Sequence, residues 1–411
     1  MNTGKRFYDA LVSVADKLTP LWGLLPGKKG KFFRGRRHWK KQLQQAGISP
    51  GGIWIHAASA GEYEQALPLM ESLKKRFPGR PVILTFFSPS GYEFLKDKTP
   101  ADYVCYLPLD TRKNAAYFID RIKPALALFI KYEFWPNFLK TLKEKSIPVF
   151  LVSGVFRENQ SVLKQNFLKD ALHNFSGFFV QDEKSAALLR GEGLNNVMVT
   201  GDTRFDRVKT LPGTRIDFPV IKDFKAGRKL LVAGSTWPED EDLLVDFIED
   251  PRARDWKLLI VPHEPTPDHI KQLLKKIRSK AALYSRYAQK DKDARILIGD
   301  VMGLLKYVYR YADTAYVGGG FGKGIHNILE AAVYSVPVLF GPNYKKFNEA
   351  VNLLQQGGAF VITSSKELKD LMFITLHDEN IKKAGKIAGK FVNDRTGAVE
   401  KITEVLEKYI N

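Results

Sequence analysis

Short apolar runs alternate with amphipathic stretches along the chain from residue 53 onward. Strands are expected in the first half at residues 53–56, 82–87, 104–107, 125–130, 149–152, 178–181 and 197–200, and in the second half at residues 229–233, 257–261, 295–298, 314–317, 337–340 and 360–363. Most of these runs are uninterrupted, which is typical of parallel strands buried on both faces. Helical periodicity fills the intervals, for example at residues 63–75, 185–192 and 240–249. The alternation predicts an α/β fold made of doubly wound parallel sheets.

The expected strands are too many for one compact sheet, so the chain is predicted to form more than one domain. Periodicity is weak between residues 208 and 228, where Pro212, Gly213 and Pro219 occur. The final helical patterns, at residues 381–391 and 398–409, could return to the first domain. We therefore predict a basic amphipathic membrane-associating segment at 1–50, an N-terminal Rossmann-like domain at 51–206, a linker at 207–226, a C-terminal Rossmann-like domain at 227–390 and a C-terminal helix at 391–411 that returns to the N-terminal domain.

The N-terminal segment has the pattern of a helix that lies on a membrane. Phe7, Leu11, Val14, Leu18 and Leu21 recur at roughly helical spacing. Charged residues and a proline interrupt the run, so it is too short in apolar residues to span a bilayer and is a poor signal peptide. No other segment of the sequence reads as a membrane span. An apolar helix edge followed by cations and aromatic residues is typical of an interfacial helix.

The formal net charge of +19 is concentrated near this helix. Between residues 28 and 41 there are eight basic residues and no acid, with Phe32, Phe33 and Trp39 among them. A solvated basic face, a nucleic-acid contact and an anionic membrane surface all remain open interpretations. The neighbouring apolar helix favours the membrane, and no nucleic-acid-binding module is visible in the sequence.

The numbers and positions of cysteine and histidine residues limit the disulfides and metal sites that the chain can form. The single cysteine, Cys105, excludes an internal disulfide framework and cysteine-rich zinc sites, and the seven histidines are scattered. We therefore expect no structural metal and no cofactor, and a reducing cytoplasmic compartment.

A glycine-rich loop is the most informative motif. Residues 316–330 read YVGGGFGKGIHNILE, in which an apolar strand runs into five glycines and then into a helical pattern. Backbone N–H groups and the start of a helix can hold a phosphate, and glycine lets the phosphate approach closely. The loop comes too late in the chain for a dinucleotide fingerprint and lacks the Gly-Lys-Ser/Thr of a Walker loop. A phosphorylated ligand is therefore expected in the second domain.

The first post-strand turn holds Ser59, Gly61 and Glu62. Ligands of doubly wound sheets bind beyond the carboxyl ends of the strands, so such turns are where chemistry is expected. Ser59-x-x-Glu62 also fits a capping box, in which both side chains serve only the helix. A carboxylate at this place could instead act as a general base. The sequence leaves both roles open.

Two further turns of the first half carry charged candidates. Glu133 could contact substrate, pair with Lys131, or cap the helix that Pro136 opens. Arg204 offers a planar fork for phosphate or carboxylate, or it could form a surface pair with Asp206.

The turns of the second half repeat this arrangement. Thr236 and Glu239 fit another capping box, with Pro238 in the first helical turn. Residues 261–264 and 299–304 likewise follow predicted strands. We expect these turns and the glycine loop to line one edge of the second sheet.

Taken in order, these motifs resemble the Kdo transferases, the 3-deoxy-D-manno-octulosonic acid transferases of Gram-negative lipopolysaccharide synthesis. The resemblance runs from about residue 53 to the C-terminus. It rests on His56-x-x-Ser59-x-Gly61-Glu62, Leu107-Pro108-x-Asp110, Glu133-x-Trp135-Pro136-Asn137, Ser235-Thr236, Gly299-Asp300-x-Met302-Gly303, Gly318-Gly319, His326-Asn327-x-Leu329-Glu330 and Gly341-Pro342.

The resemblance implies a GT-B glycosyltransferase, in which two Rossmann-like domains face each other across a cleft. It implies metal-independent, inverting transfer of Kdo from CMP-Kdo to a lipid A precursor, with CMP-Kdo bound by the C-terminal domain and the acceptor beside the N-terminal one. It also implies a peripheral enzyme on the cytoplasmic face of the inner membrane, contacting the anionic surface through residues 1–41 and binding no nucleic acid.

Roles transfer onto matching positions. Glu62 would be the base that deprotonates the acceptor hydroxyl, and Arg204, at a position usually occupied by lysine, would stabilise the transition state. Glu133 is the third catalytic candidate. Glu330 could accept from the ribose hydroxyls. The residues expected at the substrate and nucleotide are Ser59, Gly61, Ser235, Thr236, Pro262, His263, Met302, Gly303, Leu304, Gly319, Gly320, Gly322, Lys323, Gly324, His326, Asn327, Ile328, Leu329, Glu330 and Glu349.

Several positions depart from the family pattern. Lys131 stands where the family usually has an acid, and Lys346 stands where it has asparagine. His263 replaces an arginine expected at phosphate, so Lys323 or Arg204 could take over that charge. Other interpretations are a GT-B nucleotide-sugar epimerase, another glycosyltransferase and, with less support, a non-catalytic nucleic-acid-binding protein.

Overall fold

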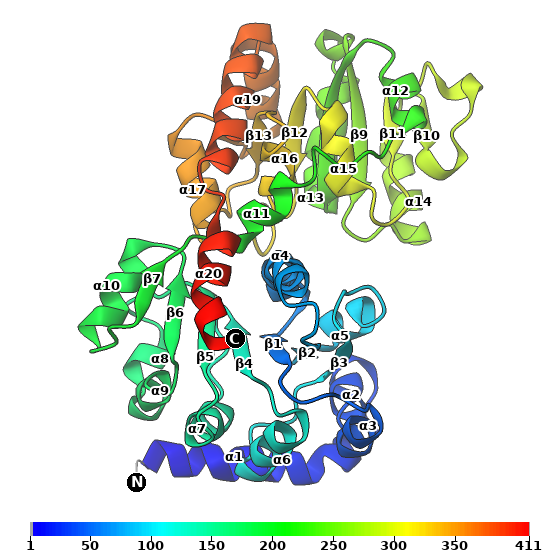
Figure 1. Cartoon of the computed structure of the whole chain (residues 1–411). Helices are drawn as coiled ribbons and strands as arrows, with labels where there is room; N and C mark the ends of the chain where they lie inside the picture. The colour runs from blue at the N-terminus through cyan, green and yellow to red at the C-terminus, as the bar shows by residue number, and fades with distance from the viewer. Residues whose placement is uncertain (1–2, 411) are drawn as a thin grey trace. The chain divides into compact units, whose positions relative to one another are not determined.

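The computed structural model describes residues 3–410. Met1, Asn2 and Asn411, which belong to the predicted first and last segments, lie outside the described residues. The chain forms two compact units, residues 1–207 with 396–411 and residues 208–395 (Figure 1). Each unit contains a seven-stranded sheet in which every neighbouring pair is parallel. The predicted α/β class with two doubly wound parallel sheets is confirmed.

The sheet of the first unit has the order β3-β2-β1-β4-β5-β6-β7. Successive residues of the central strand serve opposite cores: Trp54 packs into one cluster, whereas Ile53 and Ile55 pack into the other. This explains the uninterrupted apolar runs of the sequence. The strands are β1 (Ile53–Ala57), β2 (Val82–Phe86), β3 (Tyr103–Tyr106), β4 (Leu126–Ile130), β5 (Val149–Gly154), β6 (Gly177–Val180) and β7 (Val197–Val199).

Helices of the first unit cover both faces of this sheet. They are α1 (Thr3–Trp22), α2 (Gly27–Arg34), α3 (Trp39–Gln45), α4 (Ala60–Arg76), α5 (Pro89–Leu95), α6 (Arg112–Ile122), α7 (Pro136–Glu144), α8 (Ser161–Lys164), α9 (Asn166–Leu172), α10 (Glu183–Gly191), α11 (Thr203–Lys209) and α20 (Ala398–Ile410).

The second sheet has the order β10-β11-β9-β8-β12-β13-β14. Its strands are β8 (Lys229–Thr236), β9 (Trp256–Pro262), β10 (Ala281–Leu283), β11 (Ile296–Ile298), β12 (Thr314–Val317), β13 (Val338–Phe340) and β14 (Ala359–Val361). The sequence prediction missed β10, a three-residue edge strand, because Ala-Ala-Leu carries neither β-branched residues nor a clear period.

Helices surround the second sheet as well. They are α12 (Pro219–Lys225), α13 (Pro238–Glu249), α14 (Pro267–Lys276), α15 (Leu305–Val308), α16 (Leu329–Ala332), α17 (Asn348–Gln355), α18 (Ser365–Asp370) and α19 (Asp378–Asn393), with short 3₁₀ or π turns between several of them. Helix α12 falls inside the predicted linker 207–226, which is therefore not structureless.

The C-terminal helix α20 belongs to the first unit. Ile402, Leu406 and Ile410 enter the core beside β1. The carboxylate of Asp206 accepts hydrogen bonds from the N–H groups of Gly397 and Val399, at 2.6 and 3.1 Å. These bonds satisfy donors at the start of α20, so a side chain distant in sequence caps this helix.

Helix α1 packs on the first unit through its polar side. Tyr8 donates to Asp110 (2.8 Å), while Asn137 and Asn114 donate to Asp9 and Asp16, each at 2.9 Å. These partners follow β3 and β4 or open α6 and α7, so α1 runs past the carboxyl edge of the sheet. Figure 1 shows α1 crossing α7 and α6.

The opposite side of α1 is apolar and exposed. Phe7, Leu11 and Leu21 are 70%, 59% and 61% exposed, and Val14, Leu24 and Leu25 are exposed with them. At about 100° per residue, these α1 side chains form a narrow stripe roughly opposite Asp9 and Asp16. Among the described residues, no helix is both long and apolar enough to cross a membrane.

Candidate functional site

Glu62 lies in the first turn of α4, directly after β1. Its carboxylate accepts a hydrogen bond from the hydroxyl of Ser59, and the Ser59 oxygen accepts one from the Gly61 N–H at 3.3 Å. The predicted cap at Ser59 is therefore present, but Glu62 binds the capping hydroxyl and not the N-cap backbone. Since Glu62 is only partly buried, one side of the carboxylate remains accessible to a ligand.

Glu133 is held by a network that reaches into the core. Its Oε2 accepts from Trp135 Nε1 at 2.8 Å and lies 3.1 Å from Nε2 of the buried His56. An ionised carboxylate only accepts, so Nε2 of His56 carries a proton in this arrangement. Nδ1 of His56 lies 2.8 Å from Thr85 Oγ1, and Trp54 Nε1 donates to that same oxygen at 2.9 Å. Glu133 thus has a fixed orientation.

The expected alternatives for Glu133 are resolved on this geometry. Lys131 does not pair with it but lies over the Tyr132 ring, 5.4 Å from its centroid. Glu133 does not cap α7, because the N–H groups of Asn137 and Phe138 donate to Asp110, at 3.1 and 2.9 Å. Glu133 instead lines a cavity of about 390 Å³ whose aromatic wall includes Phe87 and Trp135, with the polar Gln160 opposite. Aromatic faces beside hydrogen-bonding groups suit a sugar ring.

Arg204 pairs with Asp202 and not with Asp206, so the expected surface pair is wrong. Two guanidinium nitrogens of Arg204 donate to Asp202 Oδ2, at 2.9 and 2.7 Å, while Gln65 donates to Oδ1 at 3.0 Å. Burial opposes ionisation of Asp202, but the adjacent Arg204 charge lowers the pKa of this carboxyl below its ordinary value. Asp206 is absent from the pair because it caps α20.

Tyr132 connects these groups electrostatically. Burial raises its pKa, the charges of Arg157 and Arg204 oppose the rise, and Asp182 and Glu62 add to it. Tyr132 therefore lies within the electrostatic range of both Glu62 and Arg204, which places them in one neighbourhood. The sequence prediction did not include Tyr132, although it directly precedes Glu133 in the turn after β4 and could have been found there.

In the second unit, the buried carboxylate of Asp240 organises the glycine loop. It accepts from the Gly319 N–H (2.9 Å), the Tyr316 hydroxyl (2.7 Å) and the Trp237 N–H (2.9 Å). Burial raises the pKa of Asp240, and these donors act against the rise. The predicted Thr236–Glu239 capping box is wrong, because Asp240 serves the N-cap residue Trp237. Thr236 donates instead to Glu241, at 3.0 Å.

The glycine loop uses several of its N–H groups internally. Gly318 donates to Gly234, Gly322 and Gly324 donate to Gly319, and His326 donates to Gly318. A Cβ at Gly320 would lie 2.5 Å from Gly341, so the loop packs tightly on the turn after β13. These N–H groups are therefore engaged within the protein and do not face a phosphate in this conformation.

The helix expected after the loop is short. It was predicted from Asn327, but α16 spans Leu329–Ala332 only. Asn327 accepts from the Leu329 N–H at 3.1 Å and donates to Glu330 at 3.4 Å, as expected of a cap-like pair. Such a helix offers little dipole, so side chains must supply most of the positive charge for a bound phosphate.

Three aromatic side chains stack beside the loop. The rings of His263 and His326 are stacked with centroids 4.3 Å apart, and Trp237 lies 5.0 Å from His263. Nε1 of Trp237 donates to Nε2 of His326 at 3.2 Å. That nitrogen is then an acceptor, so the His326 proton is on Nδ1. Flat faces at this edge could hold a planar base or a ribose.

His326 is expected to stay neutral in mildly acidic solution. Burial, followed by the neighbouring His263, lowers its pKa from 6.5 to about 4. The unfolded chain therefore takes up the proton first as the pH falls, so the stability contributed by His326 is complete above pH 6.5 and is lost toward pH 4. The His326 ring resonances should show no transition from about pH 8 to pH 5. A midpoint near 6.5 would contradict this prediction.

Lys323 belongs to a cluster of three lysines. With Lys345 and Lys346 it lines a cavity of about 650 Å³, and Asn343 holds the loop there by donating to the Gly322 carbonyl at 2.8 Å. This cluster could supply the charge that His263 lacks.

The remaining candidates differ in position. Met302 and Gly303 are exposed after β11, Leu304 is buried, and Glu349 is nearly buried in the first turn of α17. Ser235 and Thr236 end β8, and Pro262 ends β9. All of these lie at or beyond the carboxyl ends of parallel strands. No group of three or more metal-ligating side chains is found within residues 3–410.

Comparison with known proteins identifies relatives of this arrangement. The sequence profile described as 3-Deoxy-D-manno-octulosonic-acid transferase (kdotransferase) matches residues 31–207. The 3-deoxy-D-manno-octulosonic acid transferase of Rickettsia felis is 27% identical over 87% of this chain and 79% of its own length. The 3-deoxy-D-manno-octulosonic acid transferase of Chlamydophila psittaci is 28% identical over 93% of this chain and 90% of its own length. The chain is therefore similar to Kdo transferases over most of its length. It is accordingly an enzyme, a glycosyltransferase.

Solved structures share the fold of this chain. UDP-GlcNAc 2-epimerase from Neisseria meningitidis has a TM-score of 0.61 at 15% identity, covering 87% of this chain and 100% of its own. A glycosyltransferase from Rickettsia africae has a TM-score of 0.57 at 14% identity, covering 89% and 100%. At such identities the likeness concerns the architecture alone.

Proposed function

We propose that the enzyme transfers Kdo from CMP-Kdo to a lipid A precursor with inversion of the anomeric carbon and release of CMP, without a metal or other cofactor. The similarity to Kdo transferases supports the reaction class. The observation that carries the mechanism is Glu62, a carboxylate oriented by Ser59 at the carboxyl edge of the first sheet.

Glu62 acts as the general base of this reaction. One of its oxygens takes the proton of an acceptor hydroxyl while the hydroxyl oxygen bonds to the anomeric carbon of Kdo. The bond from that carbon to the phosphate oxygen breaks, and its electron pair leaves with CMP. The Ser59 hydroxyl holds the carboxylate in position. The sugar ring of the acceptor lies in the aromatic cavity lined by Glu133 and Trp135.

The second unit binds the CMP moiety. The His263–His326–Trp237 stack contacts the nucleoside, and Lys323 stabilises the charge that develops on the leaving phosphate. Asp240 keeps the glycine loop in register with β8. Arg204, held in orientation by Asp202, stabilises charge in the transition state.

A transfer assay tests the proposal directly. Purified enzyme, CMP-Kdo and a lipid A precursor should yield a product heavier by one or more Kdo residues, detected by mass spectrometry. Calorimetry should show tighter binding of CMP than of UMP or UDP. Preference for UDP, together with no Kdo adduct, would favour an epimerase-like activity on the shared architecture.

We further propose that α1 lies on the cytoplasmic face of the inner membrane. Its exposed stripe buries apolar area in the bilayer interface, while its polar side holds the first unit. The cations of residues 28–41 then meet an anionic surface. This orientation brings the carboxyl edge of the first sheet, and Glu62 with it, toward lipid-borne acceptors.

Replacing stripe leucines should weaken membrane binding. Burying one leucine side chain contributes a transfer free energy of at most about 1.5–3 kcal/mol. The double change Leu11→Ser with Leu21→Ser should therefore lower the partition coefficient for anionic vesicles by about tenfold or more. Flotation measures this. The control pair Lys17→Ser with Ala10→Ser changes exposed residues beside the stripe and should have a smaller effect. Equal flotation of wild type and the leucine variant would contradict the assignment.

A further inference from the structure

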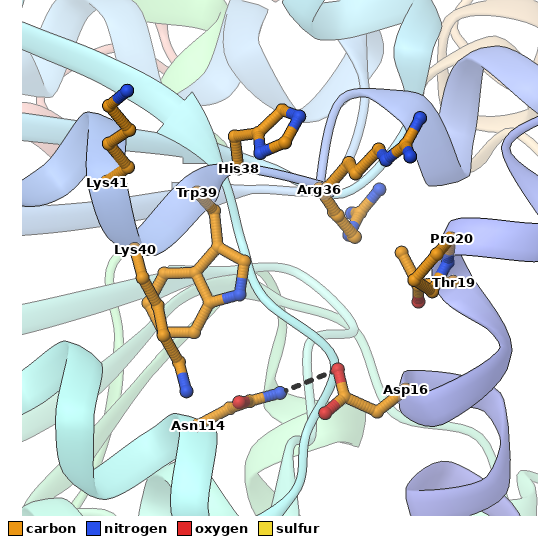
Figure 2. Close-up of a pocket in the computed structure, with 10 residues that line it drawn as sticks. Asp16, Thr19, Pro20, Arg36, His38, Trp39, Lys40, Lys41 and Asn114 are labelled. Carbon is orange, nitrogen blue, oxygen red and sulfur yellow. Dashed lines mark hydrogen bonds between the residues drawn. The ribbon is translucent and has the colours of Figure 1, made fainter.

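Beneath α1 lies a cavity of about 360 Å³ that the transfer reaction does not use. Residues from α1, from the turn between α2 and α3, from α3 itself and from α6 surround it, as Figure 2 shows. Its lining residues are Asp16, Thr19, Pro20, Arg36, Arg37, His38, Trp39, Lys40, Lys41 and Asn114.

The charges around this cavity are unbalanced. Arg36, Arg37, Lys40 and Lys41 contribute four cations, whereas Asp16 is the single acid of the lining. In the described part of the chain, none of these four cations has a carboxylate partner, although other lysines of the unit do, such as Lys74 with Asp102 and Lys145 with Asp120. Uncompensated positive charge around a hollow is the electrostatic signature of an anion site.

Hydrogen bonds and packing hold several side chains of the cavity wall in place. Asn114 donates to Asp16 Oδ1 at 2.9 Å, which ties α6 to α1 (Figure 2). Arg36 is 3% exposed and donates to three main-chain carbonyls. Trp39 packs against the core of the unit, and Lys40 lies 5.5 Å from its ring centroid. Arg37, His38 and Lys41 are exposed at the mouth, free to close on a ligand.

We infer that this cavity binds a phosphate group carried on a lipid headgroup. A cavity of about 360 Å³ exceeds what one phosphate needs and leaves room for the attached polyol or sugar. Arginine and lysine at the mouth match phosphate oxygens, and the indole face of Trp39 covers the apolar side of the attached group. Asp16, Thr19 and Pro20 line the cavity from the polar side of α1, so a headgroup at this place would lie across the helix from the membrane-facing stripe, about 10 Å away.

The source of the phosphate is either bulk anionic phospholipid or the acceptor glycolipid. Both offer the same chemistry to Arg37, Lys40 and Lys41, and the experiment below separates them. The lipid assignment rests on the membrane orientation proposed for α1, but the anion site itself rests neither on that orientation nor on Kdo transfer. Failure of the transfer assay would therefore not contradict the anion site.

The primary test is titration of the full-length protein with glycerol 3-phosphate, a soluble headgroup, followed by calorimetry or phosphorus NMR. The wild-type protein should bind glycerol 3-phosphate saturably and should show no binding of glycerol. The variant Arg37→Gln, Lys40→Gln, Lys41→Gln should bind at least about tenfold more weakly, since charge-assisted bonds to phosphate are lost. Arg36 is left intact because it holds the fold.

The matched control removes three charges from the neighbouring helix. Lys28→Gln, Lys29→Gln, Lys31→Gln lies in the same basic segment but outside the cavity lining. Its affinity for glycerol 3-phosphate should stay within about threefold of wild type, because diffuse attraction is weak at physiological salt. Absence of saturable binding in wild type, or equal weakening in both variants, would overturn the inference.

Two further measurements identify the lipid. Flotation with phosphatidylcholine vesicles containing phosphatidic acid reports on bulk phospholipid, and the KM for a lipid A precursor in neutral detergent reports on the acceptor. A cavity variant that floats poorly at unchanged KM points to phospholipid, and a raised KM at constant kcat points to the acceptor. If neither changes although glycerol 3-phosphate binding is lost, the lipid assignment is wrong.

Discussion

Glu62→Gln should retain the fold and lose Kdo transfer by about 10²–10⁴-fold, the range expected when a general base is removed. Glutamine has nearly the same volume and can still accept from Ser59, so α4 keeps its N-terminus. It cannot take the proton of the acceptor hydroxyl. Initial rates measured by mass spectrometry at saturating CMP-Kdo should therefore fall in kcat, while calorimetric CMP affinity stays unchanged.

Glu64→Gln is the matched control for this change. Glu64 lies two residues further along α4, and its carboxylate is 3.7 Å from Arg207. Exposed pairs of this kind contribute little, so transfer should remain close to wild type. Equal losses in both variants would indicate a general effect of charge on α4, and full activity of Glu62→Gln would remove Glu62 from the role of base.

Arg36→Met should lower the unfolding free energy of the first unit by about 3–5 kcal/mol, as expected when a buried hydrogen-bonded charge is removed and its partners are left unsatisfied. Nε, Nη1 and Nη2 of Arg36 donate to the carbonyls of Leu107, Phe32 and Phe87 at 2.7–2.9 Å. The rings of Phe32, Phe87 and Tyr106 lie within 4.8 Å of its guanidinium carbon. Burial lowers the pKa of Arg36 to about 9, so it is still charged at neutral pH.

The loss should reach the acceptor side of the site. Phe87 contacts Trp135, with ring centroids 4.6 Å apart, and Trp135 donates to Glu133. Hydrogen exchange of the full-length protein should therefore accelerate in β2 and β3 and in the turn at Glu133. Arg37→Met, an exposed neighbour, should change stability by less than about 0.5 kcal/mol. Unchanged exchange in Arg36→Met would show that the buried cation is dispensable.

Local sequence signals were sufficient for the architecture. Runs such as residues 126–130 and 258–260 are apolar throughout because both faces of a parallel strand are covered. Such a run can be recognised in the sequence without knowing the partner strands. Ser59 was recognisable as a helix cap because capping acts over two or three residues. A three-residue edge strand such as β10 lacks enough period to be seen.

Site details were less accessible because their partners are distant in sequence. Thr236 and Glu239 have correct capping spacing, yet Asp240 takes the role, since the same carboxylate also binds Gly319 and Tyr316, about eighty residues away. Arg204 could be matched with Asp206 by proximity. That choice failed because Asp206 is engaged by the start of α20, nearly two hundred residues later.

The sequence alone determined the alternation of strands and helices, the position of Glu62 in a post-strand turn, the family resemblance and the amphipathic basic N-terminus, because each depends on neighbours or on a short period. Only the tertiary structure decided that α1 turns its apolar stripe outward, that Arg36 is a buried structural cation while Arg37, Lys40 and Lys41 surround a cavity, and that the glycine loop is held by Asp240. Every residue of a basic run has the same local pattern. Burial distinguishes Arg36 from its neighbours, and that burial depends on contacts with Phe87 and Leu107, which directly follow β2 and β3.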